Sequence, residues 1–335
     1  MSNGYDFNPW KGLEEEVAID QDHSTISNEA SLYETFPYIQ DVEGVGIGVG
    51  MDQMLDIFAN TNLSQIYIID VLPKVSLTTR ALLEIGRYHY LRYRSYPSVR
   101  EFLGYLTRDK ITETLELIKS SFSDTQMRII KGAFSEEIES DEEIRPLKIL
   151  YYLTFKSKQT YFRSWISDDS VLERVIEAYR YGRIVPIIGS LSGDVTMFKI
   201  SERISAEGLN VGLIYESNFK MYLEPEGQSK YSQNLRQLPM DKDAKIIKTI
   251  MSRENHPLPV NQDQQMKKLM ANWLYIVRSN KDMKKEESDP ITIEIDGEEF
   301  VLRDIYDRID AFMFGGVSEE IVGLKRVGNI VLAGV

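Results

Sequence analysis

Two stretches of the chain alternate short apolar runs with helical patterns, and small or polar residues separate the two. In the first, Val42 to Asp70, an apolar run, a glycine-rich turn, a helical pattern and a second apolar run ending in an acid follow one another. The second, Arg183 to Leu223, repeats this order with a turn of small residues. Short apolar runs are typical of parallel strands covered on both faces. The pattern therefore predicts two β-α-β units in a mostly parallel sheet.

Helical spacing of apolar residues dominates the region between these two units. It predicts a long helix after Asp70, two or three helical pieces over residues 97–131, and a helix over residues 169–182 that ends at Gly182. In the second unit, Ile184 to Ile188 and Val211 to Tyr215 are the predicted strands. Pro186 weakens the first of these predictions, because proline has no N–H to donate to a ladder.

The last hundred residues carry further patterns, and the most regular of them come at the end. Residues 238–252 predict another strand, and residues 261–279 predict a helix. Residues 291–302 alternate apolar and polar positions around Asp296-Gly297, a dipeptide typical of a tight hairpin turn, and a helical pattern follows over residues 302–313.

Together these elements predict an α/β fold with a Rossmann-like, mostly parallel sheet and helices on both faces. We expect an acidic N-terminal arm (residues 1–40) that packs on the main domain, and a Rossmann-like domain (residues 41–280) with a helical insertion at about 97–165. A C-terminal hairpin and helix (residues 281–335) complete the predicted organisation.

The composition narrows the class of protein. The 335 residues are 42% hydrophobic, which is enough for a large core. The net charge of −13 makes non-specific nucleic-acid binding unfavourable, although a local basic patch is compatible with this net charge. The absence of cysteine excludes disulfides and thiolate metal sites. The three histidines are scattered, so no metal centre is predicted. No signal peptide or membrane-spanning run is evident, and a cytoplasmic protein is expected.

The glycine-rich turn is the first candidate binding element. Glycines at every second position leave one face of the strand open to close approach by backbone or ligand, and the amides that begin the next helix attract anions. Asp70 lies twenty residues beyond Gly50, where an acid in a nucleotide-binding fold accepts hydrogen bonds from ribose hydroxyls. Close strand–helix packing is the alternative for the glycines, and a cap or turn role is the alternative for Asp70. The candidates here are Gly46, Gly48, Gly50, Gln53 and Asp70.

Two further clusters follow predicted strands, and the carboxyl ends of parallel strands meet at one edge of a sheet. We expect both clusters to face the same small, nucleotide-like ligand. The alternatives are that Asp194 caps the following helix and that the later cluster begins a capped helix. The candidates are Gly189, Ser190 and Asp194 in the first cluster and Glu216, Ser217 and Asn218 in the second.

Several of these elements, in the same order, resemble a little-characterised group of bacterial proteins. The resemblance covers residues 43–225: a GVG-x-x-Q turn at Gly48 to Gln53, a strand ending IYIID at Asp70, an Ala-Leu-x-Glu helix at Ala81 to Glu84, a VPIIG strand, and a strand that runs into Ser217-Asn218. That group is similar in fold to S-adenosylmethionine-dependent methyltransferases. The resemblance implies a Rossmann-like fold and S-adenosylmethionine as the cofactor.

Three functions are compatible with these residues. The first hypothesis is an S-adenosylmethionine-binding, methyltransferase-like protein. The second is a non-catalytic binding or scaffold module on the same fold, which bulky residues such as Met51 or Met54 beside the turn would favour. The third and weaker hypothesis is an NAD(P)-dependent oxidoreductase, for which a regular G-x-G-x-x-G is expected and is not present.

Overall fold

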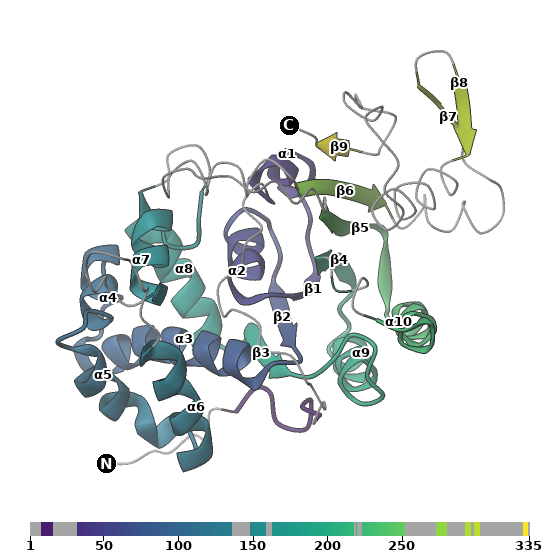
Figure 1. Ribbon diagram of the computed structural model, residues 1–335. Coiled ribbons are helices and arrows are strands. Elements are labelled where there is room, and N and C mark those ends of the chain that lie inside the picture. Colours follow the sequence, from purple (N-terminus) through teal and green to yellow (C-terminus); the bar gives the residue numbers. More distant parts are fainter. Residues whose placement is uncertain are drawn as a thin grey trace, which may run out of the picture.

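A seven-stranded sheet forms the centre of the molecule (Figure 1). The computed structural model describes residues 8–15, 32–135, 148–158, 163–217, 219, 223–251, 273–279, 292–295, 298–301 and 331–333. The strands lie in the order β3-β2-β1-β4-β5-β6-β9. Their bounds are β1 Val45–Val49, β2 Gln65–Asp70, β3 Ile184–Ile188, β4 Val211–Ser217, β5 Met240–Met251, β6 Trp273–Ser279 and β9 Val331–Ala333.

The first five strands are parallel, whereas β6 runs antiparallel to β5 and β9 runs antiparallel to β6. The order 3-2-1-4-5 is that of a doubly wound fold, with the sixth place taken by an antiparallel strand. The Rossmann-like prediction is confirmed. The chain crosses from β3 at one edge to β4 on the far side of β1, so the strand order reverses between β1 and β4, which is where such folds bind ligands.

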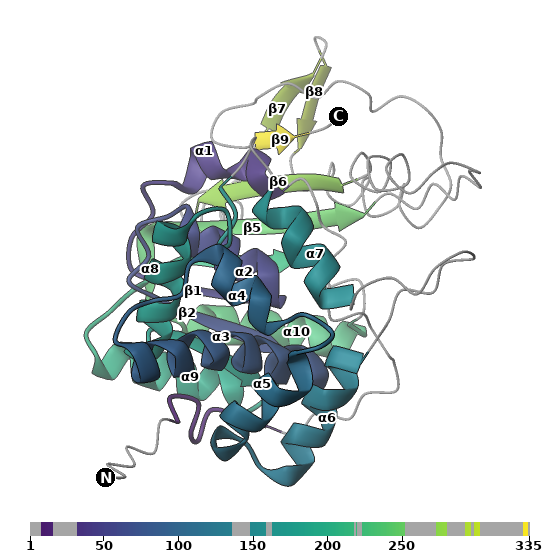
Figure 2. The same cartoon turned by 90° about the vertical axis from the view of Figure 1, so that its left-hand side faces the viewer.

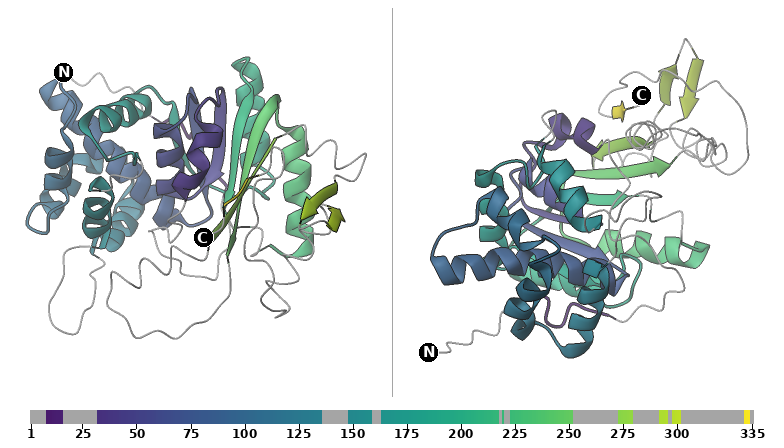
Figure 3. Two further views of the ribbon diagram at one scale, coloured as in Figure 1. Left: turned by 90° about the horizontal axis from the view of Figure 1, so that it is seen from above. Right: turned by 60° about the vertical axis from the view of Figure 1, so that its left-hand side comes forward.

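Helices cover both faces of this sheet (Figure 3). On one face α2 (Met51–Ala59), α3 (Pro73–Tyr93) and α8 (Asp169–Arg180) contact one another, and on the other face α9 (Thr196–Ala206) contacts α10 (Pro225–Gln237). Every residue of α2 is buried, because the sheet, α3 and α8 surround it. The helices predicted after Asp70 and over 169–182 correspond to α3 and α8.

A helical layer lies between α3 and α8 in sequence and packs around them (Figure 2). It comprises α4 (Val99–Tyr105), α5 (Ile111–Ile118), the 3-10 turn η2 (Lys119–Ser121), α6 (Asp124–Ser135) and α7 (Lys148–Ser157). A short 3-10 turn, η1 (Leu32–Thr35), and α1 (Phe36–Ile39) precede the first strand. The predicted helical pieces over 97–131 correspond to α4, α5 and α6. Among the residues that the structure describes, no helix combines the length and apolar character that crossing a membrane requires.

Pro186 is compatible with its strand because β3 is the edge of the sheet. Its carbonyl accepts hydrogen bonds from Nε and Nη2 of Arg80, at 3.0 and 2.8 Å. The N–H and C=O of one strand residue point to the same side, so the missing donor of Pro186 faces away from β2. The edge position explains why proline is tolerated in this strand.

Trp273–Ser279 corrects the prediction of a helix over 261–279. This segment is β6, which pairs antiparallel with β5 from Met251↔Trp273 to Lys245↔Ser279. A short apolar run fits a buried strand as well as a helix, and pairing with β5 decides between them. The remainder of that predicted helix lies outside the described residues.

The C-terminal hairpin prediction is confirmed in its strands. β7 (Thr292–Ile295) pairs antiparallel with β8 (Glu298–Val301), in the register that a turn at Asp296-Gly297 requires. The turn itself and the helix predicted over 302–313 lie outside the described residues. The division into arm, Rossmann-like domain and C-terminal segment stays a prediction.

Candidate functional site

Four of the predicted site elements meet at one edge of the sheet. The pairs Gly48↔Tyr215 and Val49↔Ile69 align the ends of β1, β2 and β4, so the turn at Gly50 lies between Asp70 and Ser217. On the other side of β2, Asp70 is paired with Ile188, and its carbonyl accepts a hydrogen bond from the amide of Gly189 at 2.9 Å. The glycine turn, Asp70, the loop after β3 and the end of β4 therefore share the carboxyl edge of the parallel strands.

The glycines of the turn have different environments. A Cβ on Gly46 would lie 2.8 Å from Leu63 Cδ1, and one on Gly48 would lie 2.5 Å from Met54 Sδ and 2.7 Å from Tyr215 Cβ. These two glycines allow β1 to pack closely against α2 and β4. Gly50 has a φ of 79°, a left-handed conformation that favours glycine, and it is the N-cap residue of α2.

Gln53 lies over this turn from the first turn of α2. Its side chain is 5% exposed, and its Oε1 would lie 2.7 Å from a Cβ on Gly50. Within the described part of the chain this oxygen has no hydrogen-bond partner. A buried amide oxygen without a partner is costly, so it is suited to a donor from a ligand.

Asp70 ends β2 beside the same turn. Its Oδ1 accepts a hydrogen bond from the backbone N–H of Leu72 at 2.9 Å, which makes Asp70 a turn residue, whereas no side chain caps α3. Burial raises the pKa of Asp70 from 3.8 to about 7, and the hydrogen bond from Leu72 opposes that effect. A carboxylate that accepts one amide hydrogen bond can still accept further hydrogen bonds from the hydroxyls of a ligand.

The loop after β3 holds a carboxylate of the protein itself. The N-terminal strap (residues 8–15) lies along β3, where the Glu15 N–H donates to the carbonyl of Ile188 at 3.2 Å. The Glu15 side chain accepts from the amide of Ser190 at 3.3 Å and from that of Val195 at 2.9 Å. A Cβ on Gly193 would overlap Glu15 Oε1. Glu15 therefore occupies the anion-binding position at the start of α9.

Asp194 does not cap α9. Its side chain is 82% exposed and forms an ion pair with Lys230 of α10. Asn234 of α10 also holds the loop after β3, because its Nδ2 donates to the carbonyls of Leu191 at 2.9 Å and Gly193 at 2.8 Å. The capping alternative for Asp194 is therefore wrong, and Glu15 takes that place.

Glu216 of β4 faces α10. It is buried, and its Oε1 accepts a hydrogen bond from the Tyr231 hydroxyl at 2.6 Å. Burial and the neighbouring Glu216 carboxylate raise the pKa of Tyr231 well above its usual value. Ser217 ends the strand with a φ of 52°, a left-handed conformation that is uncommon outside glycine. Asn218 lies outside the described residues.

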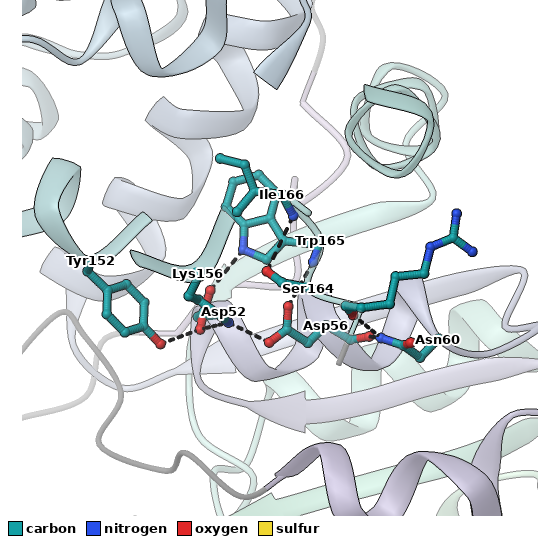
Figure 4. A network of polar contacts seen from close by, with 9 residues as sticks. Asp52, Asp56, Asn60, Tyr152, Lys156, Ser164, Trp165 and Ile166 are labelled. Carbon is teal, nitrogen blue, oxygen red and sulfur yellow. Dashed lines mark hydrogen bonds and ion pairs between the residues drawn. The ribbon is translucent and has the colours of Figure 1, made fainter. Parts of the chain in front are cut away.

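A buried polar network at the first two turns of α2 was not predicted (Figure 4). Asp52 Oδ1 accepts from Trp165 Nε1 at 2.8 Å, and its Oδ2 accepts from the Tyr152 hydroxyl at 2.6 Å. Asp56 Oδ1 accepts from the backbone N–H of Trp165 at 2.9 Å. Lys156 of α7 forms ion pairs with both carboxylates. The network therefore joins the helical layer to α2, the helix that follows Gly50.

The charges in this network perturb one another. Burial raises the pKa of Asp56 from 3.8 to about 7; Lys156 lowers it, and Asp52 raises it. Burial lowers the pKa of Lys156, but the two carboxylates outweigh that effect and raise it above the usual value. The sequence held one signal of this network: two acids four residues apart in a mostly apolar helix. Nothing local indicated the partners, which lie about a hundred residues later.

The chain belongs to the family described as a domain of unknown function, DUF7790, which matches residues 24–303. No curated protein matches the chain. Among solved structures, the chain is similar to the rRNA methyltransferase AviRa from Streptomyces viridochromogenes, with 10% identity and a TM-score of 0.33. That similarity covers 74% of this chain and 81% of that one.

Proposed function

We propose that this protein binds S-adenosylmethionine at the edge formed by Gly50, Gln53 and Asp70, and that it is methyltransferase-like. The observation that carries the proposal is Asp70, a carboxylate at the end of β2 beside the glycine turn, where a single amide hydrogen bond satisfies it in part. Ribose hydroxyls are the donors that an acid at this position accepts in nucleotide-binding folds. Gln53 Oε1 supplies a second acceptor over the same turn.

The charge around α2 favours a cationic ligand over a pyrophosphate. Asp52 and Asp56 face the single ammonium of Lys156 in the buried network, so this part of the site is not a basic surface. A dinucleotide places its two phosphates at the start of this helix, where nearby carboxylates repel them. S-adenosylmethionine has one carboxylate beside a positive sulfonium and a positive amino group, so its net charge is positive and the same acids disfavour it less than a pyrophosphate. This supports the methyltransferase-like hypothesis over the oxidoreductase.

In such chemistry the protein chiefly positions groups. The cofactor supplies an activated methyl group, and the residues at this edge bind the ribose and orient the cofactor. The absence of cysteine supports a reducing, cytoplasmic location as a further expectation.

A non-catalytic binding module is the second candidate function. The observation that favours it is the packing of Met51 and Met54, both fully buried, with the Met54 sulfur against Gly48. The Met54 side chain fills space beside β1 that an open glycine face leaves to a ligand. Binding without methyl transfer would fit this candidate.

Calorimetric titration tests the proposal. S-adenosylmethionine, S-adenosylhomocysteine and NAD are titrated into the wild-type protein, Asp70→Asn and Glu207→Gln. Glu207 is a matched acid beyond the opposite end of α9, paired with Arg203 at 3.1 Å. Micromolar binding of the first two ligands, lost in Asp70→Asn and kept in Glu207→Gln, is the expected result. Binding of NAD alone, or no heat with any ligand, would overturn the proposal.

A further inference from the structure

The far end of α3 carries a cluster of tyrosine and arginine side chains in an otherwise acidic protein. Between Arg87 and Arg108 the sequence has five arginines, no lysine and a single acid, Glu101. The whole chain, by contrast, has a net charge of −13. This segment includes the last two turns of α3, the connection to α4 and α4 itself. The local charge is therefore opposite in sign to that of the whole molecule.

Aromatic side chains are exposed among these arginines. Tyr93 is 53% exposed and Tyr181, just beyond α8, is 65% exposed. α3 and α8 pack side by side, so the end of α8 adds to the same surface (Figure 2). We name this surface the Tyr/Arg patch and define it by Tyr90, Arg92, Tyr93, Tyr96, Arg180 and Tyr181. Aromatic side chains that are exposed next to one another mark interaction sites more often than isolated ones do.

The patch is ordered by contacts between its own members. The guanidinium of Arg180 lies 3.5 Å from the ring centroid of Tyr90 and 5.2 Å from that of Tyr181, and it donates to the Tyr96 hydroxyl at 2.5 Å. Arg92 lies 5.3 Å from the Tyr93 ring and donates to the Tyr88 hydroxyl at 3.0 Å. Because these planar groups are held in place, a ligand that stacks on them loses little side-chain entropy.

Exposed arginines of the same segment, in and next to the patch, keep their charge free for a partner. Arg92, Arg94 and Arg100 are exposed, and within the described part of the chain none of the three forms an ion pair with an acid. Arginine matches phosphate geometry and also stacks on planar rings. A partner with repeated anions and flat apolar faces meets both properties, and single-stranded nucleic acid has this chemistry.

We propose that the Tyr/Arg patch binds single-stranded nucleic acid, with tyrosine rings stacking on bases and arginines contacting phosphates. The patch lies at the end of α3 opposite Asp70, and a helix of 21 residues is about 30 Å long. Binding there is therefore separate from the proposed cofactor site and is measured without any cofactor. The acidic remainder of the molecule confines the contact to this surface.

Fluorescence anisotropy with labelled 12-nucleotide oligo(U) RNA and oligo(dT) DNA, at 50 and 200 mM salt, tests this proposal. The variants are Tyr93→Ala and the arginine pair Arg92→Gln with Arg100→Gln. The matched control is Phe198→Ala with Lys199→Gln, an exposed aromatic and cation on α9 whose ammonium lies 5.3 Å from the ring. Thermal melting by circular dichroism confirms that each variant folds.

Wild-type protein is expected to bind a probe at micromolar concentration and to lose affinity as salt rises. Tyr93→Ala should weaken binding about tenfold, and the arginine pair should reduce the salt slope by about one to two. Binding of RNA alone would assign RNA, and equal binding would assign single strands of either kind. No binding by wild type, an equal loss in the α9 control, or equally effective competition by polyglutamate would overturn the proposal.

Discussion

Burial brings the pKa of two acids close to neutral: Asp70 at the carboxyl edge of the sheet and Asp56 in α2. In Asp70 and Asp56, burial raises the pKa to about 7, although their partners differ. Asp70 has one amide donor, whereas Asp56 shares Lys156 with Asp52. Burial of the two carboxylates therefore has different consequences. Asp70 can still accept a hydrogen bond from a ligand, whereas Asp56 is held in the interior by its ion pair with Lys156.

The raised pKa of Asp70 predicts a pH dependence of stability. Between about pH 4 and pH 7 the folded state keeps the proton that the unfolded state loses, so the unfolding free energy falls as pH rises. Asp70→Asn, which stays neutral, should be more stable than wild type at pH 8 by on the order of 2 kcal/mol and similar to it at pH 4. Urea unfolding at pH 8 and at pH 4 measures this difference in stability, and Glu202→Gln, at an exposed acid, is the control. An equal difference at both pH values would contradict the prediction.

Lys156 offers a second prediction at the scale of one side chain. Lys156→Met leaves Asp52 and Asp56 buried without their cation, which should cost about 3 to 5 kcal/mol of unfolding free energy. The loss should be smaller at pH 5, because the carboxylates then take up protons. Lys199→Met removes an exposed ammonium that pairs with Glu202 at 2.8 Å and should change stability by less than about 1 kcal/mol. Urea unfolding curves measure both, and losses of similar size would refute the special role of Lys156.

At the scale of elements, the N-terminal strap and the loop after β3 act as one unit. Glu15 supplies the acceptor for two loop amides, and Thr196 Oγ1 donates to the carbonyl of Leu13 at 3.0 Å. Gly193 is required because Glu15 fills the place of a side chain. The loop conformation therefore depends on a segment more than 170 residues earlier.

A double-mutant cycle tests this dependence. Gly193→Ala should destabilise the wild-type protein by on the order of 2 kcal/mol through overpacking, and it should have little effect in a Glu15→Ala background. The coupling energy measures the contact itself. Hydrogen exchange at the amides of Ser190 and Val195 should become faster in Glu15→Ala. Equal effects of Gly193→Ala in both backgrounds would rule out the contact.

Elements with strong local patterns could be predicted, and pairings between distant segments could not. The strands around Ile184 and Val211 and the helix over 169–180 follow from apolar spacing alone. The sequence of Trp273–Ser279 predicts a helix although the segment is a strand, because its run of apolar residues has no period that separates the two states. In the site, Asp70 and Gly50 lie on one local unit and were found together. Glu15 and Lys156 reach the site through tertiary contacts, and no local pattern indicates them.

At the scale of the whole molecule, the N-terminal strap covers a strand at the edge of the sheet. β3 is the edge of the sheet, and Trp10 and Glu14 cover it through Arg80, whose guanidinium lies 4.0 Å from the Trp10 ring and pairs with Glu14. Edge strands without cover pair with other chains. Arg80 is fully buried, so the strap is part of the folded core.

Removal of residues 1–15 should therefore promote association. The truncated protein exposes the outer edge of β3 and an unpaired Arg80, and its sedimentation coefficient should rise with concentration more steeply than that of the full chain. Analytical ultracentrifugation between low and high micromolar concentration measures this, and circular dichroism confirms that the sheet has formed. Identical sedimentation of the two proteins would show that the strap does not protect the edge.

The position of β1 at the centre of the sheet has a consequence for synthesis on the ribosome. Its partner β2 follows closely in the sequence, but β4, on its other side, begins 161 residues after β1 ends, counting residues 50–210. At the usual rate of translation this is a delay of roughly 8 to 32 s. During that time the open side of β1 has no partner from its own chain. The nascent protein is therefore most exposed to mispairing, and most in need of a chaperone, before Val211 emerges.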